Sequence, residues 1–322
     1  MNTKPGVLWM ALFWLLLVLS VSPMVAYGQH LSPEQLKAMP PKALIQAWES
    51  ATRTDRSLIQ EALLENRSSS LLALHEAVLT GTFEQKRLAL DLLAEMRDKR
   101  SIETLLLAAT SDSDDLVRTR TIIVLRDIGD RSVAPRLRNL LRASQSGFVL
   151  SACLAALGKL GSSQDIPLIK PWLTSPEEGV RVQTAAALAL LGSSEGQDIL
   201  LASTRSNDPL MQQWATEALG YLNTAEARAR LEEILNDPIG QWKSYARIAL
   251  AQQELNTKDM QAKIESLNLL TQDTNNRVAR WAVEQLADLG TPEATQLLRD
   301  IAPKGGKVGQ RATWLLKAKE GR

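Results

Sequence analysis

The chain has 322 residues, which is enough for two ordinary domains or for one elongated array. Helix-forming residues dominate and runs of β-branched residues are scarce, so the composition predicts an all-α fold. The formal net charge is +1, and Lys4 is the one charged side chain of residues 1–28. Non-specific binding of nucleic acid depends on neutralising many phosphates, so this near-neutral chain is not expected to bind nucleic acid.

The N-terminus has the features of an export signal. Lys4 precedes an uncharged apolar run at residues 7–21, which Ser22 and Pro23 interrupt. Ala26 and Gly28 then place small residues three and one positions before Gln29, as signal peptidase prefers. We expect a signal peptide at residues 1–28, cleavage after Gly28, and a periplasmic or secreted protein. The alternative is an uncleaved segment that anchors the protein in the inner membrane.

Cys153 is the one cysteine, so no intrachain disulfide can form. An exported protein without disulfides fits a bacterial periplasm better than a eukaryotic secretory route. Cys153 falls within an expected helix, where other repeats carry Ala or Thr, and we expect it to be a small buried apolar side chain.

The first part of the mature chain, residues 29–84, is expected to be helical but irregular. Ser32 and Pro33 form a helix start, with Ser as the cap and Pro at the first helical position. A helix with Trp48 is expected over residues 42–51, and a first helical pair over residues 55–65 and 69–79. We interpret residues 29–84 as a helical cap region, because the end unit of an array must cover its open side.

A regular repeat occupies residues 85–322. Its units start 32, 32, 31, 31, 31, 36 and 30 residues apart, and such a period predicts a repeat array. The starts are Gln85, Val117, Val149, Val180, Met211, Trp242, Val278 and Val308. The ninth residue is always Leu: Leu93, Leu125, Leu157, Leu188, Leu219, Leu250, Leu286 and Leu316. The fifth is always small: Ala89, Thr121, Cys153, Thr184, Ala215, Ala246, Ala282 and Ala312. Positions five and nine share one helical face, so they predict the buried seam of each first helix.

Each unit also predicts a second helix after a turn. The thirteenth position carries residues that tolerate a left-handed backbone: Gly129, Gly161, Gly192, Asn223 and Gly290. The second helix has an aliphatic residue at a constant offset: Leu105, Leu137, Ile169, Leu200, Leu231 and Leu298. The predicted fold is therefore an all-α α-solenoid, a right-handed superhelix of antiparallel helix pairs, with about eight units and the last one half formed. About five extra residues between Leu250 and Leu270 form either a longer corner or a local change in curvature.

The pattern V-R-x-x-[AT]-A-x-A-L-x-x-[LI]-G, with a capped second helix and an Asp-Pro corner, resembles HEAT repeats. It is most similar to the short bacterial HEAT-like type first associated with phycobilisome lyases. The resemblance implies an architecture used by scaffolds, adaptors and a few enzymes. It also implies an Asp–Arg ladder, of which Asp112/Arg118 and Asp237/Lys243 keep the six-residue spacing. Three other units lack the basic residue, so we expect an incomplete ladder.

We predict no catalytic residue, no metal site and no cofactor. His30 and His75 are the two histidines, and HEAT-like hydroxylases hold di-iron with several His-Glu pairs, whereas this chain has one, at His75 and Glu76. His75 is expected on a helix surface. The chain has no Gly-rich phosphate loop, no Cys-pair zinc spacing and no Gly-x-Ser-x-Gly motif. The alternative is an enzyme subunit or a HEAT-like lyase-type enzyme.

Aromatic residues at the fourth repeat position are the first candidate for binding. Trp214, Tyr245 and Trp281 occupy it in three successive units, and Tyr221 lies two turns along the helix from Trp214. If the first helices line the concave face, these residues form an aromatic stripe of the kind that binding surfaces enrich. The alternative is packing between repeats, which we also expect for Trp172, Trp242 and Trp314.

The second candidate is the basic segment at residues 118–142, which contains seven Arg. Arg118 and Arg120 belong to its first helix, and Arg136 and Arg138 to the second. Such a segment would contact an acidic peptide, lipid headgroups or an anionic polysaccharide, or would be a solvated face with local salt bridges. Together these features predict a non-catalytic scaffold that binds a protein or peptide on its concave face, with membrane contact only if residues 1–28 are retained.

Overall fold

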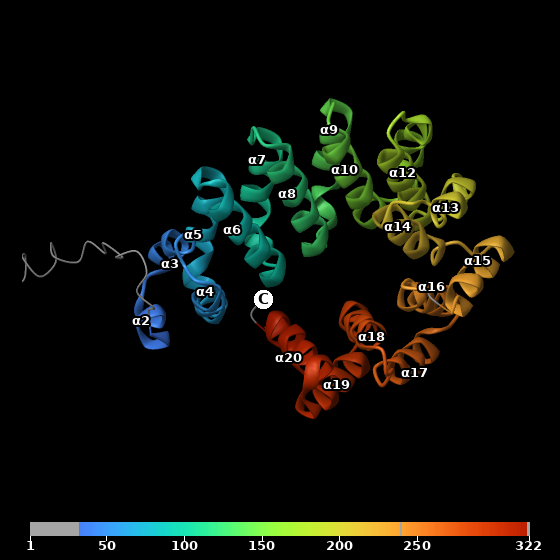
Figure 1. The fold of residues 1–322 in the computed structure, drawn as a ribbon. Helices are drawn as coiled ribbons and strands as arrows, with labels where there is room; N and C mark the ends of the chain where they lie inside the picture. The colour runs from blue at the N-terminus through green and yellow to red at the C-terminus, as the bar shows by residue number, and fades with distance from the viewer. Residues whose placement is uncertain (1–31, 239, 321–322) are drawn as a thin grey trace, which may run out of the picture. The chain divides into compact units, whose positions relative to one another are not determined.

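The computed structural model describes residues 32–238 and 240–320, so the predicted signal peptide and its cleavage site lie outside the described residues. The described part contains nineteen α-helices and no strand, and the all-α solenoid prediction is confirmed (Figure 1). None of its helices is both long and apolar enough to span a membrane. Two compact units divide the chain at residues 73 and 74, inside α5 (Arg67–Thr80).

The first unit contains α2 (Pro33–Ala38), α3 (Pro41–Ala47) and α4 (Arg53–Glu65), followed by the start of α5. Ser32 caps α2 as predicted, in a capping box with Gln35. Both α2 and α3 pack on α4, and Leu36, Leu44 and Ile59 are buried. Trp48 follows α3 directly and is buried, with the Arg56 guanidinium 5.1 Å from the centre of its ring.

The second unit consists of helix pairs. The first helices are α6 (Phe83–Met96), α8 (Asp115–Ile128), α10 (Gly147–Leu160), α12 (Glu178–Leu190), α14 (Pro209–Leu219), α16 (Lys243–Asn256), α18 (Asn276–Leu289) and α20 (Gly306–Glu320). The second helices are α7 (Ile102–Ser111), α9 (Ala134–Ala143), α11 (Ile166–Ile169) with η4 (Lys170–Thr174), α13 (Gln197–Ser203), α15 (Ala225–Asn236), α17 (Met260–Leu270) and α19 (Pro292–Ile301). Each first helix from α6 to α18 packs on the next first helix, which gives two layers.

The predicted seam forms the core of these pairs. Ala89, Leu93, Ala215 and Leu219 are fully buried, and the same positions are buried in most other units. Gly158 also allows α10 and α12 to approach closely, because a Cβ on this residue would lie 2.8 Å from the Cα of Ala187 in α12. The first helices therefore stack through small residues at fixed positions, as the repeat pattern predicts.

The helix ends differ from the prediction at two of the five turn positions. Gly129, Gly192 and Gly290 have φ between 67° and 86°, as expected for a left-handed turn. Gly161 instead has φ −81°, and a Cβ there would lie 2.5 Å from the carbonyl oxygen of Leu157. Asn223 also lacks a positive φ, whereas Arg97, at the same position of the first repeat, adopts it. Glycine is therefore needed at residue 161 because a Cβ would clash with the Leu157 carbonyl oxygen, and not because the backbone is left-handed there.

The corners between repeats share a local motif that the sequence analysis missed. A Ser or Asp side chain accepts a hydrogen bond from the backbone N–H two residues later, directly before five of the first helices. The residues are Asp112, Ser144, Ser175, Ser206 and Asp273. The ladder also differs from expectation, because Asp112 pairs with Lys86 of the preceding helix and Arg118 pairs with Asp115. Asp112 thus connects its corner to the first helix of its own repeat.

The five extra residues lengthen α16 by one turn relative to α14 and widen the following corner. The added turn contains Gln253, which is buried. Its Nε2 donates to the carbonyl oxygens of Leu219 and Leu222, at 3.0 and 2.8 Å. The Leu219 carbonyl oxygen ends α14 and also accepts from the Leu222 N–H at 3.2 Å, so Gln253 connects the end of the shorter α14 and the residues after it to α16.

Candidate functional site

A groove of about 880 Å³ runs along the first helices of the second unit. Its walls come from α8, α10, α12, α14, α16, α18, the residues directly after α14, and the start of α20. All four predicted aromatic residues line it: Trp214, Tyr221, Tyr245 and Trp281. The structure therefore brings the aromatic stripe together in one groove.

The aromatic rings both pack and face the groove. Trp214 packs against the buried cluster of α12, α14 and α16, and Trp281 against the cluster of α18, α19 and α20. Both tryptophans keep partial exposure, and Tyr221 is 39% exposed. Trp214 and Trp281 thus pack on the core and line the groove at the same time, and rigid rings of this kind suit a binding surface.

Glu217 lies between Trp214 and Tyr221 on the groove face of α14, one turn from each. Gln213 Nε2 donates to its Oε1 at 3.0 Å. The Glu217 carboxyl still reaches solvent, but the groove walls reduce the water around it. This partial loss of hydration raises the pKa of Glu217. The same loss of hydration, and then the charge of Glu217, raises the pKa of Tyr221.

Arg277 connects α18 to Tyr245 of α16. Its Nη1 donates to the Tyr245 hydroxyl at 2.6 Å, and its Cζ lies 4.2 Å from the ring centre. The Tyr245 ring also contacts Trp242, with ring centres 5.5 Å apart. Trp242 itself packs on the core and donates to Gln212 Oε1, so the packing prediction for Trp242 holds.

The basic candidates lie elsewhere. Arg118 Nε donates to the carbonyl oxygen of Ala109 at the end of α7, and its Nη1 pairs with Asp115. Arg120 pairs with Asp91 of α6. Neither residue lines the groove.

The rest of the basic segment divides between the two layers. Arg126 of α8 lines the groove and pairs with Asp127. Arg136 and Arg138 of α9 pair with Glu103 and Asp165. The arginines of this segment therefore lie in different places, at a corner, in the groove and on a second helix, and most of them have acidic partners.

The sequence analysis missed several groove residues. Glu217, Arg277, Arg280, Lys159 and Lys307 line the groove. Four of them were predictable from the sequence, because positions 0, 4, 7, 8 and 11 of a repeat share one helical face, and Arg280, at position 3, is outside this set. In α18 these positions are Arg277, Trp281, Glu284, Gln285 and Asp288, and all of them line the groove. Following the helical face that contains position four would have identified these four charged residues.

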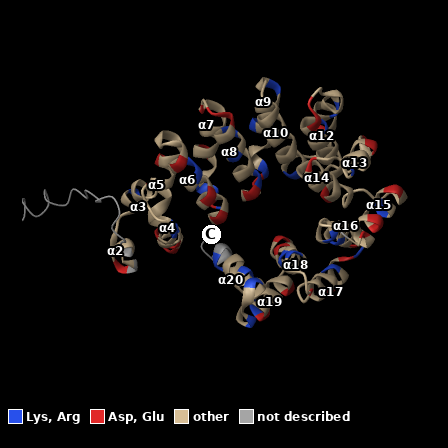
Figure 2. Ribbon diagram, viewed as in Figure 1, with Lys and Arg blue, Asp and Glu red and all other residues tan. Residues whose placement is uncertain are grey.

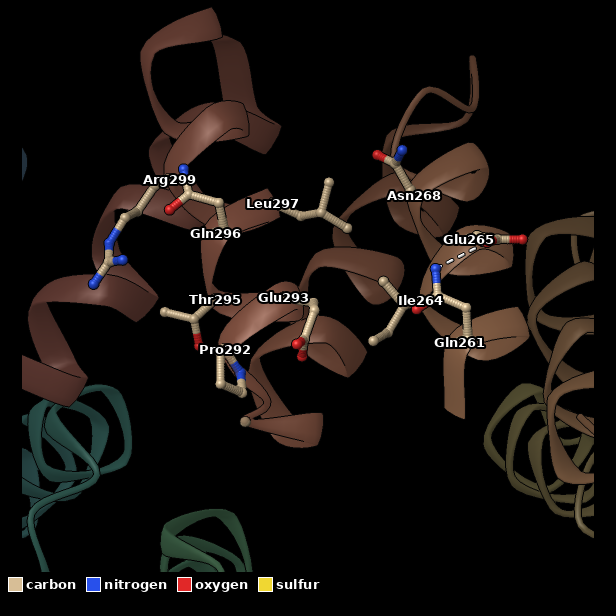
Figure 3. A pocket seen from close by; sticks show the side chains of 11 residues that line it. Gln261, Ile264, Glu265, Asn268, Pro292, Glu293, Thr295, Gln296, Leu297 and Arg299 are labelled. Atoms are coloured by element: carbon tan, nitrogen blue, oxygen red, sulfur yellow. Dashed lines mark hydrogen bonds between the residues drawn. The ribbon is translucent and has the colours of Figure 1, made fainter. Parts of the chain in front are cut away.

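A second opening of about 890 Å³ lies in the second-helix layer, between α17 and α19 (Figure 3). Ile264, Asn268 and Glu265 come from α17, and Glu293 and Leu297 from α19. Gln261 donates to Glu265 across one turn of α17. Ile264 is buried and Leu297 packs on the same core cluster, so this opening is a shallow gap between neighbouring helices.

His75 and Cys153 have structural positions. His75 was expected on a helix surface, but it is half-buried and its Nε2 lies 3.0 Å from Ser101 Oγ. Burial lowers the pKa of His75. Cys153 is buried as predicted, and burial raises the pKa of its thiol to about 12, so it stays protonated at neutral pH. In the part of the chain that the structure describes, no three His, Cys, Asp or Glu side chains form a metal-binding group.

Among solved structures, the complex of CpcE and CpcF of phycocyanin lyase from Nostoc sp. PCC7120 is similar, with 24% identity and a TM-score of 0.53. That match covers 75% of this chain and 94% of that chain. Human deoxyhypusine hydroxylase in complex with glycerol has 17% identity and a TM-score of 0.37, covering 81% of this chain and 99% of that chain. An engineered protein has 17% identity and a TM-score of 0.38, covering 90% and 92%. No curated protein matches the sequence.

Two family models match the chain. The model for HEAT repeats matches residues 71–158, 102–181 and 166–251, which together make up more than half of the chain. The model for the PBS lyase HEAT-like repeat matches residues 278–302. These matches agree with the helix pairs and the small-residue seam described above. The chain therefore belongs to the HEAT-repeat family.

Proposed function

We propose that this protein is a non-catalytic HEAT-repeat interaction module that holds a protein or peptide segment in the groove of its first helices. The observation that carries the proposal is the convergence of Trp214, Tyr221, Tyr245 and Trp281, from three successive repeats, on one groove. Aromatic side chains on rigid helices bury a large apolar area at low entropic cost, and they dominate the energetics of many interfaces.

The charges of the groove also support a binding role. Asp127 pairs with Arg126, and Glu284 pairs with Arg311, so two of its carboxylates are held in ion pairs. Gln183, Gln213, Gln252 and Gln285 add amide groups along the same walls. Amides both donate and accept hydrogen bonds, which suits the backbone of an extended peptide.

The groove is tested with an unbiased displayed peptide library. We expect selected peptides to bind at least about tenfold more weakly to Trp214→Ala/Trp281→Ala. Phe148→Ala/Leu269→Ala removes two exposed apolar side chains outside the groove and is the matched control, with unchanged binding expected. Because both tryptophans also pack on the core, Tyr221→Ala provides a second variant with less effect on folding. Selected peptides that bind all variants alike would contradict the proposal.

We further propose that the protein is exported to the periplasm and that residues 1–28 are removed. The order of charged start, apolar run and small residues before Gln29 supports this. Intact mass of the protein recovered from the periplasmic fraction is the test, and a chain that begins at Gln29 is expected. A mass that includes residues 1–28 would support the membrane-anchored scaffold instead.

A further inference from the structure

One end of the groove carries basic side chains that the fold does not neutralise. Arg277 and Arg280 of α18 and Lys307 of α20 line this end, and basic segments recur along α20 (Figure 2). No carboxylate of the described residues forms an ion pair with these three side chains. In the second-helix layer, by contrast, Arg136 pairs with Glu103 at 3.0 Å and Lys170 pairs with Glu195.

Tyr245 orients one of these cations without neutralising it. The hydroxyl accepts the 2.6 Å hydrogen bond from Arg277 Nη1, and the ring lies under the guanidinium. A cation held against an aromatic ring keeps its full charge. Arg277 is therefore positioned beside the groove and still able to bind a carboxylate.

The neighbouring carboxylates do not make the net charge of this end of the groove negative. Glu284 is engaged by Arg311, at 2.9 Å, and Asp288 is the other acid of α18 that lines the groove. Burial is the largest cause that lowers the pKa of Arg311, and the nearby charge of Arg280 lowers it further. The charge of Arg277 also acts on Glu217 of α14, so four cations share this region with three carboxylates, which leaves an excess of positive charge.

We propose that this end of the groove binds an acidic peptide segment in an extended conformation. Its Asp or Glu side chains meet Arg277, Arg280 and Lys307, and an apolar side chain packs on Trp281. This assignment rests on the proposed function, and it names the chemistry of the partner. Guanidinium groups form bidentate pairs with carboxylates, which favours Asp and Glu among the side chains of a peptide.

The dimensions suggest the spacing of the acidic residues. Packed helices lie about 8–10 Å apart, and an extended chain advances about 3.3 Å per residue. Side chains two residues apart lie on the same face of an extended chain, about 6.6 Å apart, and long Glu, Arg and Lys side chains bridge the rest of the step from α18 to α20. A long polyanion is a poorer fit, since nucleic acid binding relies on many phosphate contacts and the whole chain has a net charge of +1.

Glu217 makes the part of the groove over α14 different in charge from the basic end. Its carboxylate lies on α14 between Trp214 and Tyr221, in the same groove as the basic end. Gln213 is its hydrogen-bond partner among the described residues. An acidic residue over α14 would face this like charge, so the acidic part of the segment lies over α18 and α20, and a neutral or basic part lies over α14.

Three labelled probes test the proposal by fluorescence anisotropy with the full chain. The first is a peptide of about twelve residues with Glu at every second position and one central Leu in that series. The second replaces Glu by Lys, and the third is an oligothymidylate of matched charge. We expect the Glu peptide to bind at least about tenfold more tightly than either of the others.

Variants then locate the binding. Arg277→Gln/Arg280→Gln is expected to weaken binding of the Glu peptide at least about tenfold, and Lys307→Gln to weaken it in the same direction. The matched control is Arg136→Gln/Arg205→Gln, which removes two exposed arginines of the second-helix layer and leaves binding unchanged. All of these side chains are exposed, and equal melting temperatures of the variants show that the fold is retained.

The proposal is overturned if the Lys peptide or the oligothymidylate binds as tightly as the Glu peptide, or if the groove double variant binds like the original chain. Library-selected peptides separate this failure from that of the proposed function. If they remain sensitive to Trp214→Ala/Trp281→Ala, the groove binds peptides of another chemistry. If they are insensitive, the proposed function fails as well.

Discussion

Asp130 links two neighbouring repeats through one carboxylate. It accepts a hydrogen bond from the Ser132 N–H at 2.9 Å, which caps the short helix η2 (Arg131–Val133), and it pairs with Lys99 at 2.9 Å. The hydrogen bonds from Lys99 and Ser132 lower the pKa of Asp130 to about 2. Its charge therefore stabilises the folded state, and this effect depends on pH.

We predict that Asp130→Ala lowers the free energy of unfolding by about 1 kcal/mol at pH 7, through the loss of the cap. The folded pKa of Asp130 lies below its ordinary value of 3.8. The contribution is thus fully present above about pH 4 and is lost as the pH falls towards 2. Urea unfolding at several pH values measures it, and Asp300→Ala, at an exposed carboxylate, is the control. A difference that stays constant down to pH 2 would contradict this account.

Hydrogen bonds at the residue scale also explain departures from the regular repeat. Gln253 of the next repeat donates to the carbonyls of Leu219, at the end of α14, and Leu222, and Ser or Asp at five corners accepts from an N–H group before the following first helix. Buried backbone groups are costly when left unpaired. Polar residues at these places therefore allow helices of unequal length to stack without loss of hydrogen bonds.

Close packing of first helices is the main feature at the scale of elements. Gly158 in α10 and Gly220 after α14 lie against the backbone of the next first helix, where a Cβ would be 2.8 Å from the Cα of Ala187 or Ala249. Gly179 in α12 is different, since its nearest atoms would be at 3.8 and 4.0 Å. Glycine thus sets the helix separation at the first two positions but not at the third.

Gly158→Ala is expected to lower the free energy of unfolding by about 1–3 kcal/mol, because α10 and α12 must move apart. Gly179→Ala is the matched control, and it is expected to be neutral or stabilising by up to about 1 kcal/mol through helix propensity. Thermal and urea unfolding of both variants provide the measurement. Equal effects of the two substitutions would show that helix separation at Gly158 is not constrained.

The second unit as a whole relies on nearest-neighbour contacts. α20 covers α18 and α19, and its Ala312 and Leu315 are buried with Leu286 and Leu298 in one cluster. In a repeat array, stability is approximately the sum of repeat terms and of interfaces between neighbours. The loss of one covering helix should therefore weaken the adjoining pair first.

We predict that a chain truncated after Lys304 melts at least about 4 °C below the full chain, since Leu286 and Leu298 become exposed. Amide hydrogen exchange should show faster exchange in α18 and α19 than in α8 and α10. Leu315→Ala, which removes buried side-chain atoms but retains α20, should give a smaller effect in the same helices. Unchanged exchange in α18 would mean that α20 does not stabilise this pair.

The sequence by itself determined the helix pairs, their order and the buried seam. A small residue and a Leu four positions later recur at a constant offset, and only a helix buried along one face requires that spacing. It also identified Trp214, Tyr245 and Trp281 as members of one stripe, because identical repeat positions face the same way. The period could not show whether these rings were packed or accessible.

The tertiary structure alone decided which charged residues share the groove and which have partners. Asp112 pairs with Lys86 and not with Arg118, and Arg138 pairs with Asp165 of the next repeat. These partners lie 26 and 27 residues apart in sequence. Such pairs depend on how the two helices of a repeat pack and on how one repeat stacks on the next, and local spacing carries no information about either. The same packing leaves Arg277, Arg280 and Lys307 beside the aromatic stripe without an ion pair to any carboxylate of the described residues, so only the folded chain shows the chemistry of the groove.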